Sequence, residues 1–260
     1  AQRKPTDTLS SYELLLKGKA LHHKVQKDAL LNALTTFDDA IKADEKNGQA
    51  YAWKACALGQ GLFRGYLEED FNTVWKQAED NLKKARELNE NDFEVHRLMS
   101  EVSLAMKDFR AAQRHSKICY EQVPNDPRVL SVYGEVCLRT GKVDEGLDAV
   151  KLALEIDPVA QGKTNADPRH AAVIFGYYMA RDKEGCLEQI NNLEEIDFKS
   201  WLLTTKICRD EEHEFSNLDW FQEGKKLFSD KDFEKEVQDF RLNNDSATET
   251  LISFAKELFS

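Results

Sequence analysis

A 34-residue repeat constrains this chain more than any other feature of its sequence. The segment that begins at Phe93 and the segment that begins at Pro127 align without a gap, 34 residues apart. Small side chains and one proline recur at equivalent places: Ser100 with Gly134, Ala112 with Gly146, Cys119 with Ala153, and Pro124 with Pro158. Such a period predicts stacked copies of one supersecondary unit.

The unit is predicted to be helical. Apolar residues recur at i, i+3 and i+4 along nearly the whole chain, whereas β-branched alternation is almost absent and only five prolines occur. With 260 residues, 41% of them hydrophobic, the chain can bury a sizeable core, as one or two domains or as an elongated array. No apolar run reaches the 18 residues typical of a membrane span, so none is expected.

The period and the small residues resemble the tetratricopeptide repeat, in which two antiparallel helices, A and B, need small side chains where they cross. The signature positions in the second of the two aligned segments hold Tyr133, Gly134, Cys137, Gly146, Ala153 and Pro158. The resemblance implies an all-α fold: a right-handed α-solenoid of about five TPR-like helix pairs with a C-terminal helical cap.

The repeat register also predicts the boundaries of the parts. The predicted units cover residues 11–47, 48–92, 93–126, 127–160 and 167–200, with residues 1–10 as a linker from a missing upstream domain and residues 201–260 as an acidic helical cap. Residues 197–260 hold 15 acidic and 9 basic side chains. We interpret this asymmetry as a solvated cap face rather than a binding site, because a solenoid must cover the apolar face of its last unit.

The second unit contains an insertion at residues 59–71, with the sequence GQGLFRGYLEEDF. Its glycines have nearly the spacing of a phosphate-binding loop, but they follow a predicted helix rather than a strand, and the acidic residues 68–70 would repel phosphate. We interpret Gly59 and Gly61 as letting a lengthened helix A bend or end before helix B starts near Asn72. The alternative is that the insertion contacts a partner.

The order of features over about residues 3–200 resembles the C-terminal repeat region of bacterial class III adenylate/guanylate cyclases and of some winged-helix regulators. In those families a Pro-Thr-x-x-Leu-x-x-Tyr segment, here Pro5, Thr6, Leu9 and Tyr12, joins an effector domain to the repeats. The resemblance implies a regulatory arm of a larger bacterial signalling protein. The chain lacks an initiator Met and a signal peptide, which predicts a fragment with a cytoplasmic location.

The net charge and the cysteine content indicate which partners and which chemistry are expected of this chain. The formal charge of −11 disfavours nucleic acid, whose phosphates an acidic surface repels. Five cysteines without a pairing motif indicate reduced thiols. Neither a metal-ligand spacing nor a nucleophile with an activating base is evident, so the sequence predicts no cofactor, no metal and no catalysis. The CRDEEHEF segment around His213 is interpreted as a charged inter-helix turn rather than a metal site.

In the tetratricopeptide family, peptides usually bind in a groove lined by the A helices, and the resemblance places eight candidate residues there: Lys19, Arg97, Glu101, Arg128, Glu135, Arg139, Phe175 and Tyr178. At the family's chaperone-binding positions in the first two units the chain has Lys19 and Cys56, with apolar Leu15 and Ala52, so that clamp for a C-terminal carboxylate is absent. One hypothesis is bidentate binding of a peptide carboxylate by Arg97 or Arg128. The alternative is that the arginines and glutamates pair with one another across neighbouring helices, and that the aromatic residues are core.

These observations predict a non-catalytic interaction module that binds a partner peptide, or a second copy of itself, through the groove. Two other functions stay open: a small-molecule sensor that uses the same concavity, and a helical enzyme with a site near the aromatic fifth unit.

Overall fold

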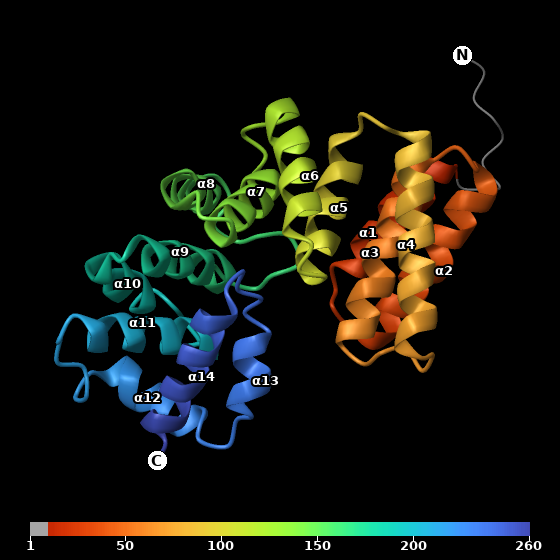
Figure 1. Ribbon diagram of the computed structural model, residues 1–260. Coiled ribbons are helices and arrows are strands. Elements are labelled where there is room, and N and C mark those ends of the chain that lie inside the picture. Colours follow the sequence, from red (N-terminus) through yellow and green to blue (C-terminus); the bar gives the residue numbers. More distant parts are fainter. Residues whose placement is uncertain (1–9) are drawn as a thin grey trace. The chain divides into compact units, whose positions relative to one another are not determined.

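Helices account for all regular structure in the computed structural model, which describes residues 10–260 as fourteen α-helices without a strand (Figure 1). The chain divides into two compact units, one ending at Val102 and the other comprising Ser103–Ser260. The boundary falls inside helix α5 (Phe93–Ala105). The predicted all-α fold of helix pairs is confirmed.

Residues 1–9 are outside the described part, and with them lie nearly all of the predicted linker and Pro5, Thr6 and Leu9 of the Pro-Thr-x-x-Leu-x-x-Tyr segment. The last residue of that segment, Tyr12, lies on the first helix with its side chain 65% exposed.

The first unit is built from consecutive helix pairs. Helix α1 (Ser11–His22) packs on α2 (Lys27–Ala43), α2 packs on α3 (Gly48–Phe63), and α3 packs on α4 (Phe71–Leu88), so that these four helices lie side by side (Figure 1). Phe37 and Trp53 lie at the centre of the buried cluster between α1, α2 and α3. Burial of this apolar stripe, rather than helix propensity, supplies most of the stability of such helices.

Local sequence explains where these helices begin. Ser10 and Glu13 form a capping box at the start of α1, in which each side chain accepts a hydrogen bond from the other residue's backbone N–H. Asp70 caps α4 by accepting from the backbone N–H of Thr73. A capped start satisfies donors that the first helical turn would otherwise leave unpaired.

The insertion lengthens the second helix pair instead of forming a separate loop domain. Helix α3 continues through Gly59 and Gly61 to Phe63, so neither of these two glycines ends it. The turn comes at Gly65, whose φ of +65° is a conformation that glycine adopts without strain. Helix α4 then starts at Phe71, one residue before the predicted position.

The second unit comprises α6 (Phe109–Gln122), α7 (Pro127–Arg139), α8 (Val143–Ile156), α9 (Asp167–Ala180), α10 (Lys183–Ile190), α11 (Phe198–Asp210), α12 (Asp219–Leu227), α13 (Phe233–Gln238) and α14 (Asp245–Leu258). The α7–α8 crossing uses the small residues that the repeat predicts. A Cβ atom on Gly134 would lie 2.9 Å from the backbone oxygen of Gly146. Only glycine at these positions therefore permits the observed approach of the two backbones.

The last four helices close the second unit with an aromatic core. Trp201 of α11 is fully buried, and its ring contacts Phe221 and Phe228 while its indole N–H donates to the Phe221 carbonyl. This core is continuous with buried side chains of α9 and α10. Within residues 10–260, no helix combines the length and the apolar character that crossing a bilayer requires.

Candidate functional site

Six of the eight predicted groove residues gather at two places, one in each unit, and Arg128 and Tyr178 lie apart from them. Those of the first unit surround the ring of Trp53, in a group that we call the Trp53 cluster: Lys19, His22, Trp53, Cys56, Glu94, Arg97 and Glu101. The Lys19 ammonium lies 4.7 Å from the Trp53 ring centroid and the Arg97 guanidinium carbon lies 5.4 Å from it. Both distances are typical of cation–π contacts.

Charges in the Trp53 cluster are balanced. The Glu94 carboxylate accepts from Lys19 at 3.0 Å and from the Arg97 Nε at 3.2 Å, and Arg97 Nη1 donates to Glu101 at 2.6 Å. The Glu94 and Arg97 side chains are only 3% and 5% exposed. Burial alone would lower the pKa of Arg97, but Glu101 and Glu94 raise it above its ordinary value. Two cations thus meet two carboxylates in a largely buried network, in which Arg97 Nη2 and the Trp53 indole N–H find no hydrogen-bond partner among the described residues.

The remaining polar groups of the cluster are neutral. Burial, followed by repulsion from His23 and Arg97, lowers the pKa of His22 to about 4. Burial, followed by the Glu101 charge, raises the pKa of the Cys56 thiol to about 12, although the His22 ring nitrogen lies 3.6 Å from its sulfur. At neutral pH this Cys–His contact therefore holds a thiol, not the thiolate that nucleophilic catalysis would need.

Arg128 is engaged by its own helix N-cap. Its Nε and Nη2 donate to the two carboxylate oxygens of Asp126 at 3.1 and 2.6 Å, and the same carboxylate caps α7. A peptide carboxylate bound bidentately by Arg128 would have to displace Asp126. Arg97 and Arg139 also pair with glutamates of their own helices, and Lys19 pairs with Glu94 of a different helix.

A cavity of about 190 Å³ lies in the second unit, beside three other predicted residues. We call it the Phe175 pocket, and its lining residues are Glu135, Leu138, Val150, Pro168, Ala171, Ala172, Phe175 and Lys199. Phe175 is 1% exposed and therefore belongs to the core, which was the alternative to a groove contact in the sequence analysis. Its ring nevertheless forms part of the pocket wall, so it serves both packing and the cavity.

Two basic side chains lie against the Phe175 ring at this pocket. The Lys199 ammonium lies 4.0 Å from the Phe175 ring centroid, and the Arg139 guanidinium carbon lies 4.9 Å from the same centroid. Arg139 pairs with Glu135 at 2.8 Å and donates to the Phe240 carbonyl at 2.9 Å. Its buried Nε and Nη1 find no hydrogen-bond partner among the described residues.

The neighbouring charges shift the pKa values of Lys199 and Glu135. Burial, followed by repulsion from Arg139, lowers the pKa of Lys199 to about 8. Burial alone would raise the pKa of Glu135, but Arg139, Lys199 and Arg241 together lower it below its ordinary value. Among the described residues, Glu135 is thus the one acidic residue of the pocket lining, with the basic Lys199 in the same lining and Arg139 beside Phe175, while Asp197 also acts on Lys199.

Two residues depart from the predicted set of groove residues. Tyr178 does not line the cavity: it is half-buried against the core of the second unit, and burial followed by the Asp210 charge raises its pKa. Lys199 was not among the predicted site residues. The repeat register placed it at the very end of the fifth unit, whereas it belongs to the first turn of α11, which packs on α9. A lone lysine in an acidic segment gives no sequence signal of this role.

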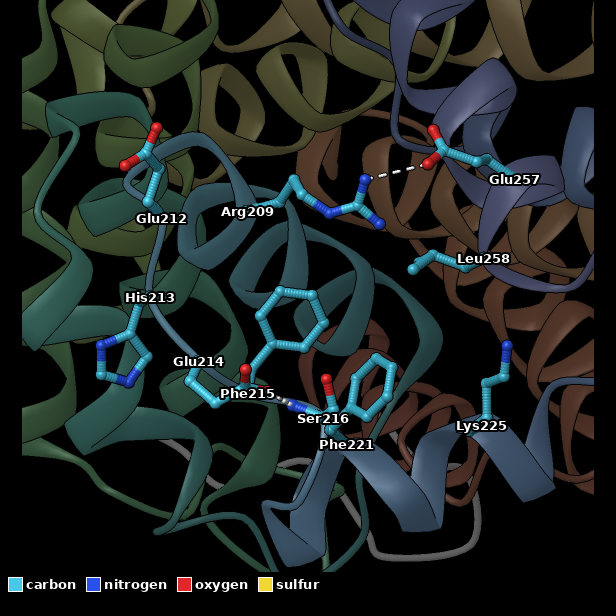
Figure 2. Close-up of a pocket in the computed structure, with 10 residues that line it drawn as sticks. All are labelled: Arg209, Glu212, His213, Glu214, Phe215, Ser216, Phe221, Lys225, Glu257 and Leu258. Carbon is cyan, nitrogen blue, oxygen red and sulfur yellow. Dashed lines mark hydrogen bonds and ion pairs between the residues drawn. The ribbon is translucent and has the colours of Figure 1, made fainter.

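The turn around His213 borders a wider hollow of about 490 Å³ in the last helices (Figure 2). Arg209 and Glu257 pair across it at 2.9 Å, and Phe215 packs edge-on against Phe221. The His213 ring stands apart from that ion pair (Figure 2). In residues 10–260, no three His, Cys, Asp or Glu side chains come together in a way that could hold a metal ion. The exposed pair and open shape make this hollow a weaker candidate site.

Comparison with solved structures identifies the architecture. The structure of pilF of Pseudomonas aeruginosa matches with a TM-score of 0.59 and 13% identity, over 84% of this chain and 90% of that chain. PilW, described as a widely conserved type IV pilus biogenesis factor, matches with the same TM-score and identity, over 83% of this chain and 92% of that chain. A tetratricopeptide repeat protein from Parabacteroides merdae matches with a TM-score of 0.52 and 14% identity, over 96% of this chain and 86% of that one.

The chain has the tetratricopeptide-repeat fold. No protein-family model and no curated protein matches the sequence. At this level of identity the likeness concerns the arrangement of helices alone. The tetratricopeptide-repeat resemblance seen in the sequence is thereby supported by the structure, and nothing in these comparisons points to a cyclase or a winged-helix regulator.

Proposed function

We propose that this chain is a protein-interaction module that binds a partner peptide through the Phe175 pocket. The observation that supports the proposal most directly is the Lys199 ammonium on the wall of a cavity that also contains an apolar surface. A peptide with an acidic group next to an apolar side chain matches both features. The acidic group would pair with the Lys199 ammonium, and the apolar side chain would cover Phe175.

The size of the pocket favours a side chain over a larger ligand. A volume of about 190 Å³ is below the roughly 300–1,000 Å³ that small-molecule and cofactor sites usually occupy. The small-molecule sensor is therefore the weaker alternative for this pocket. The Trp53 cluster is the weaker alternative for a peptide, because its charges are already paired and its groups are buried.

The proposal includes the setting expected from the sequence: a regulatory arm of a larger bacterial signalling protein in the cytoplasm, with a cyclase as one possible parent. That part is supported only by the order of sequence features and by the segment that ends at Tyr12. Binding to a second copy of the chain is the other form of the interaction and uses the same groove residues.

A peptide library tests the proposal. The probe is a set of N-acetylated octapeptides that carry a fixed leucine beside a fixed glutamate, glutamine or lysine, with all other positions randomised. We expect the wild-type chain to retain the glutamate set preferentially, by about tenfold over glutamine, because one charge-assisted contact is worth on the order of 1.5 kcal/mol. The preference should disappear in Lys199→Gln.

Lys163→Gln is the matched control, since it removes one positive charge from an exposed loop that does not line the pocket. It should retain the glutamate preference. Equal retention of all three peptide sets, or a preference that survives in Lys199→Gln, would refute the Phe175 pocket as the binding site.

A further inference from the structure

The insertion in the first unit presents three aromatic side chains that the core of that unit does not bury. We call them the aromatic stripe: Phe63 at the end of α3, and Phe71 and Trp75 four residues apart on α4. The Phe71 and Trp75 rings stack with centroids 6.3 Å apart, and Phe63 meets Phe71 edge-on at 6.5 Å. Phe63 and Phe71 are each 50% exposed, and Trp75 is half-buried.

The stripe is separate from the face by which α4 packs on α3. That face consists of Val74, Ala78, Leu82 and Ala85, at helical spacing. Phe71, Trp75 and Glu79 lie one position further around the helix, which corresponds to a rotation of about 100°. The α3–α4 contact is thus complete without the stripe, and exposed aromatic groups of this kind commonly mark interaction surfaces.

Carboxylates border the stripe and decide which partner it fits. Glu68, Glu69 and Asp70 precede Phe71, and Glu79 accepts a hydrogen bond from the Trp75 indole N–H at 2.9 Å. Hydrogen bonds from Thr73 lower the pKa of Asp70, which keeps it ionised at neutral pH. The basic residues of this segment are Arg64 and Lys76, and Lys76 already pairs with Asp80. The surface around the rings is therefore net acidic.

We propose that the aromatic stripe binds an arginine-bearing segment of a partner protein. A guanidinium stacks on aromatic faces and also donates in a fork to a carboxylate, so one arginine would use both features of this surface. A purely apolar segment would leave the four carboxylates desolvated beside it. Nucleic acid would be repelled by the same charges. This site is independent of the Phe175 pocket and does not rest on the function proposed for it.

Trp75 provides a direct readout. The chain has four tryptophans, and the other three, Trp53, Trp201 and Trp220, are buried. In the uniformly ¹⁵N-labelled full chain, the Trp75 indole N–H resonance can be assigned by its disappearance in Trp75→Phe. The probe is an acetylated and amidated tetra-arginine peptide, with tetra-lysine and tetra-glutamine as comparison peptides. We expect tetra-arginine to shift the Trp75 indole resonance selectively, and tetra-lysine to bind more weakly.

Phe71→Ala is the test variant, and Tyr12→Ala is its matched control because Tyr12 is an exposed aromatic residue elsewhere in the first unit. Losing one exposed cation–π contact should weaken tetra-arginine binding by about two- to fivefold. Tyr12→Ala should leave it unchanged. Equal shifts from tetra-lysine and tetra-arginine would show attraction by charge alone, and undiminished binding to Phe71→Ala would show that the rings take no part; either result overturns the proposal.

Discussion

The Trp53 cluster and the Phe175 pocket use the same elements, basic side chains over an aromatic ring with glutamates beside them, yet they differ in charge and space. Around Trp53 each cation has a carboxylate, and the key pair is almost fully buried. Around Phe175, Glu135 and Lys199 line a cavity, and Arg139 lies beside the ring. The paired and buried network around Trp53 suits a structural role, whereas the cavity at Phe175 leaves the space that the proposed peptide needs.

The two sites differ in the helix that supplies their lysine. Lys19 belongs to the first helix of its unit and reaches Glu94 of α5. Lys199 belongs to α11, which begins at the very end of the predicted fifth unit, and its ammonium contacts the rings of Phe175 and Phe240. Helix α11 therefore adds a positive charge beside the Arg139–Glu135 pair.

Removing the central carboxylate of the Trp53 cluster should have the largest effect. Glu94→Ala leaves Lys19 and Arg97 without that partner in a buried site, and we expect a loss of about 3–5 kcal/mol in the free energy of unfolding. Urea denaturation followed by circular dichroism measures it. Glu87→Ala, which removes an exposed carboxylate 4.0 Å from Lys84, should change stability by less than about 1 kcal/mol. Similar losses in both variants would contradict the cluster's structural role.

Acidification should also weaken the Trp53 cluster. The pKa of His22 is about 4 in the folded chain and 6.5 ordinarily, so the unfolded chain binds the extra proton first. Stability should fall as the pH decreases from 6.5 to 4, by on the order of 3 kcal/mol. His22→Gln should remove this part of the acid dependence in melting experiments. An identical acid slope in wild type and variant would show that His22 is not buried as a neutral ring.

Lys199→Met should have the opposite sign from Glu94→Ala. Because the ammonium is partly desolvated and repelled by Arg139, its replacement by an apolar side chain should raise stability at pH 7 by about 1 kcal/mol. The pKa of Lys199 is about 8 when folded and 10.5 ordinarily, so the unfolded state binds more protons between these values. Thermal melts should show the advantage of the variant shrinking as the pH rises above 8; a constant or growing advantage would argue against this desolvation.

Arg128→Ala should have the smallest effect. Its partner Asp126 still caps α7 through the backbone N–H groups of Arg128 and Val129, so we expect a loss below about 1 kcal/mol. Peptide retention in the library assay should match that of the wild type. A complete loss of retention would restore the hypothesis that Arg128 holds the peptide carboxylate and would count against the Phe175 pocket.

The sequence anticipated the fold well because the relevant signals are local and repeated. The small residues at the α7–α8 crossing and the helical periodicity were sufficient to predict stacked helix pairs. The site was harder to predict. Arg139, Glu135 and Phe175 were named at groove positions and do gather at one cavity, but Arg97 and Arg128 are engaged by acids close in sequence.

By itself, the 34-residue period determined that this chain forms antiparallel helix pairs, because the side-chain volumes at each helix crossing are encoded within one unit. Only the tertiary structure decided which charges are paired and which are not. Lys199 contacts the ring of Phe175, which lies in a different helix, and such an encounter depends on how α11 packs against α9. Burial and ion pairing depend on which side chains meet in the folded chain, and the spacing of residues along the sequence does not predict them.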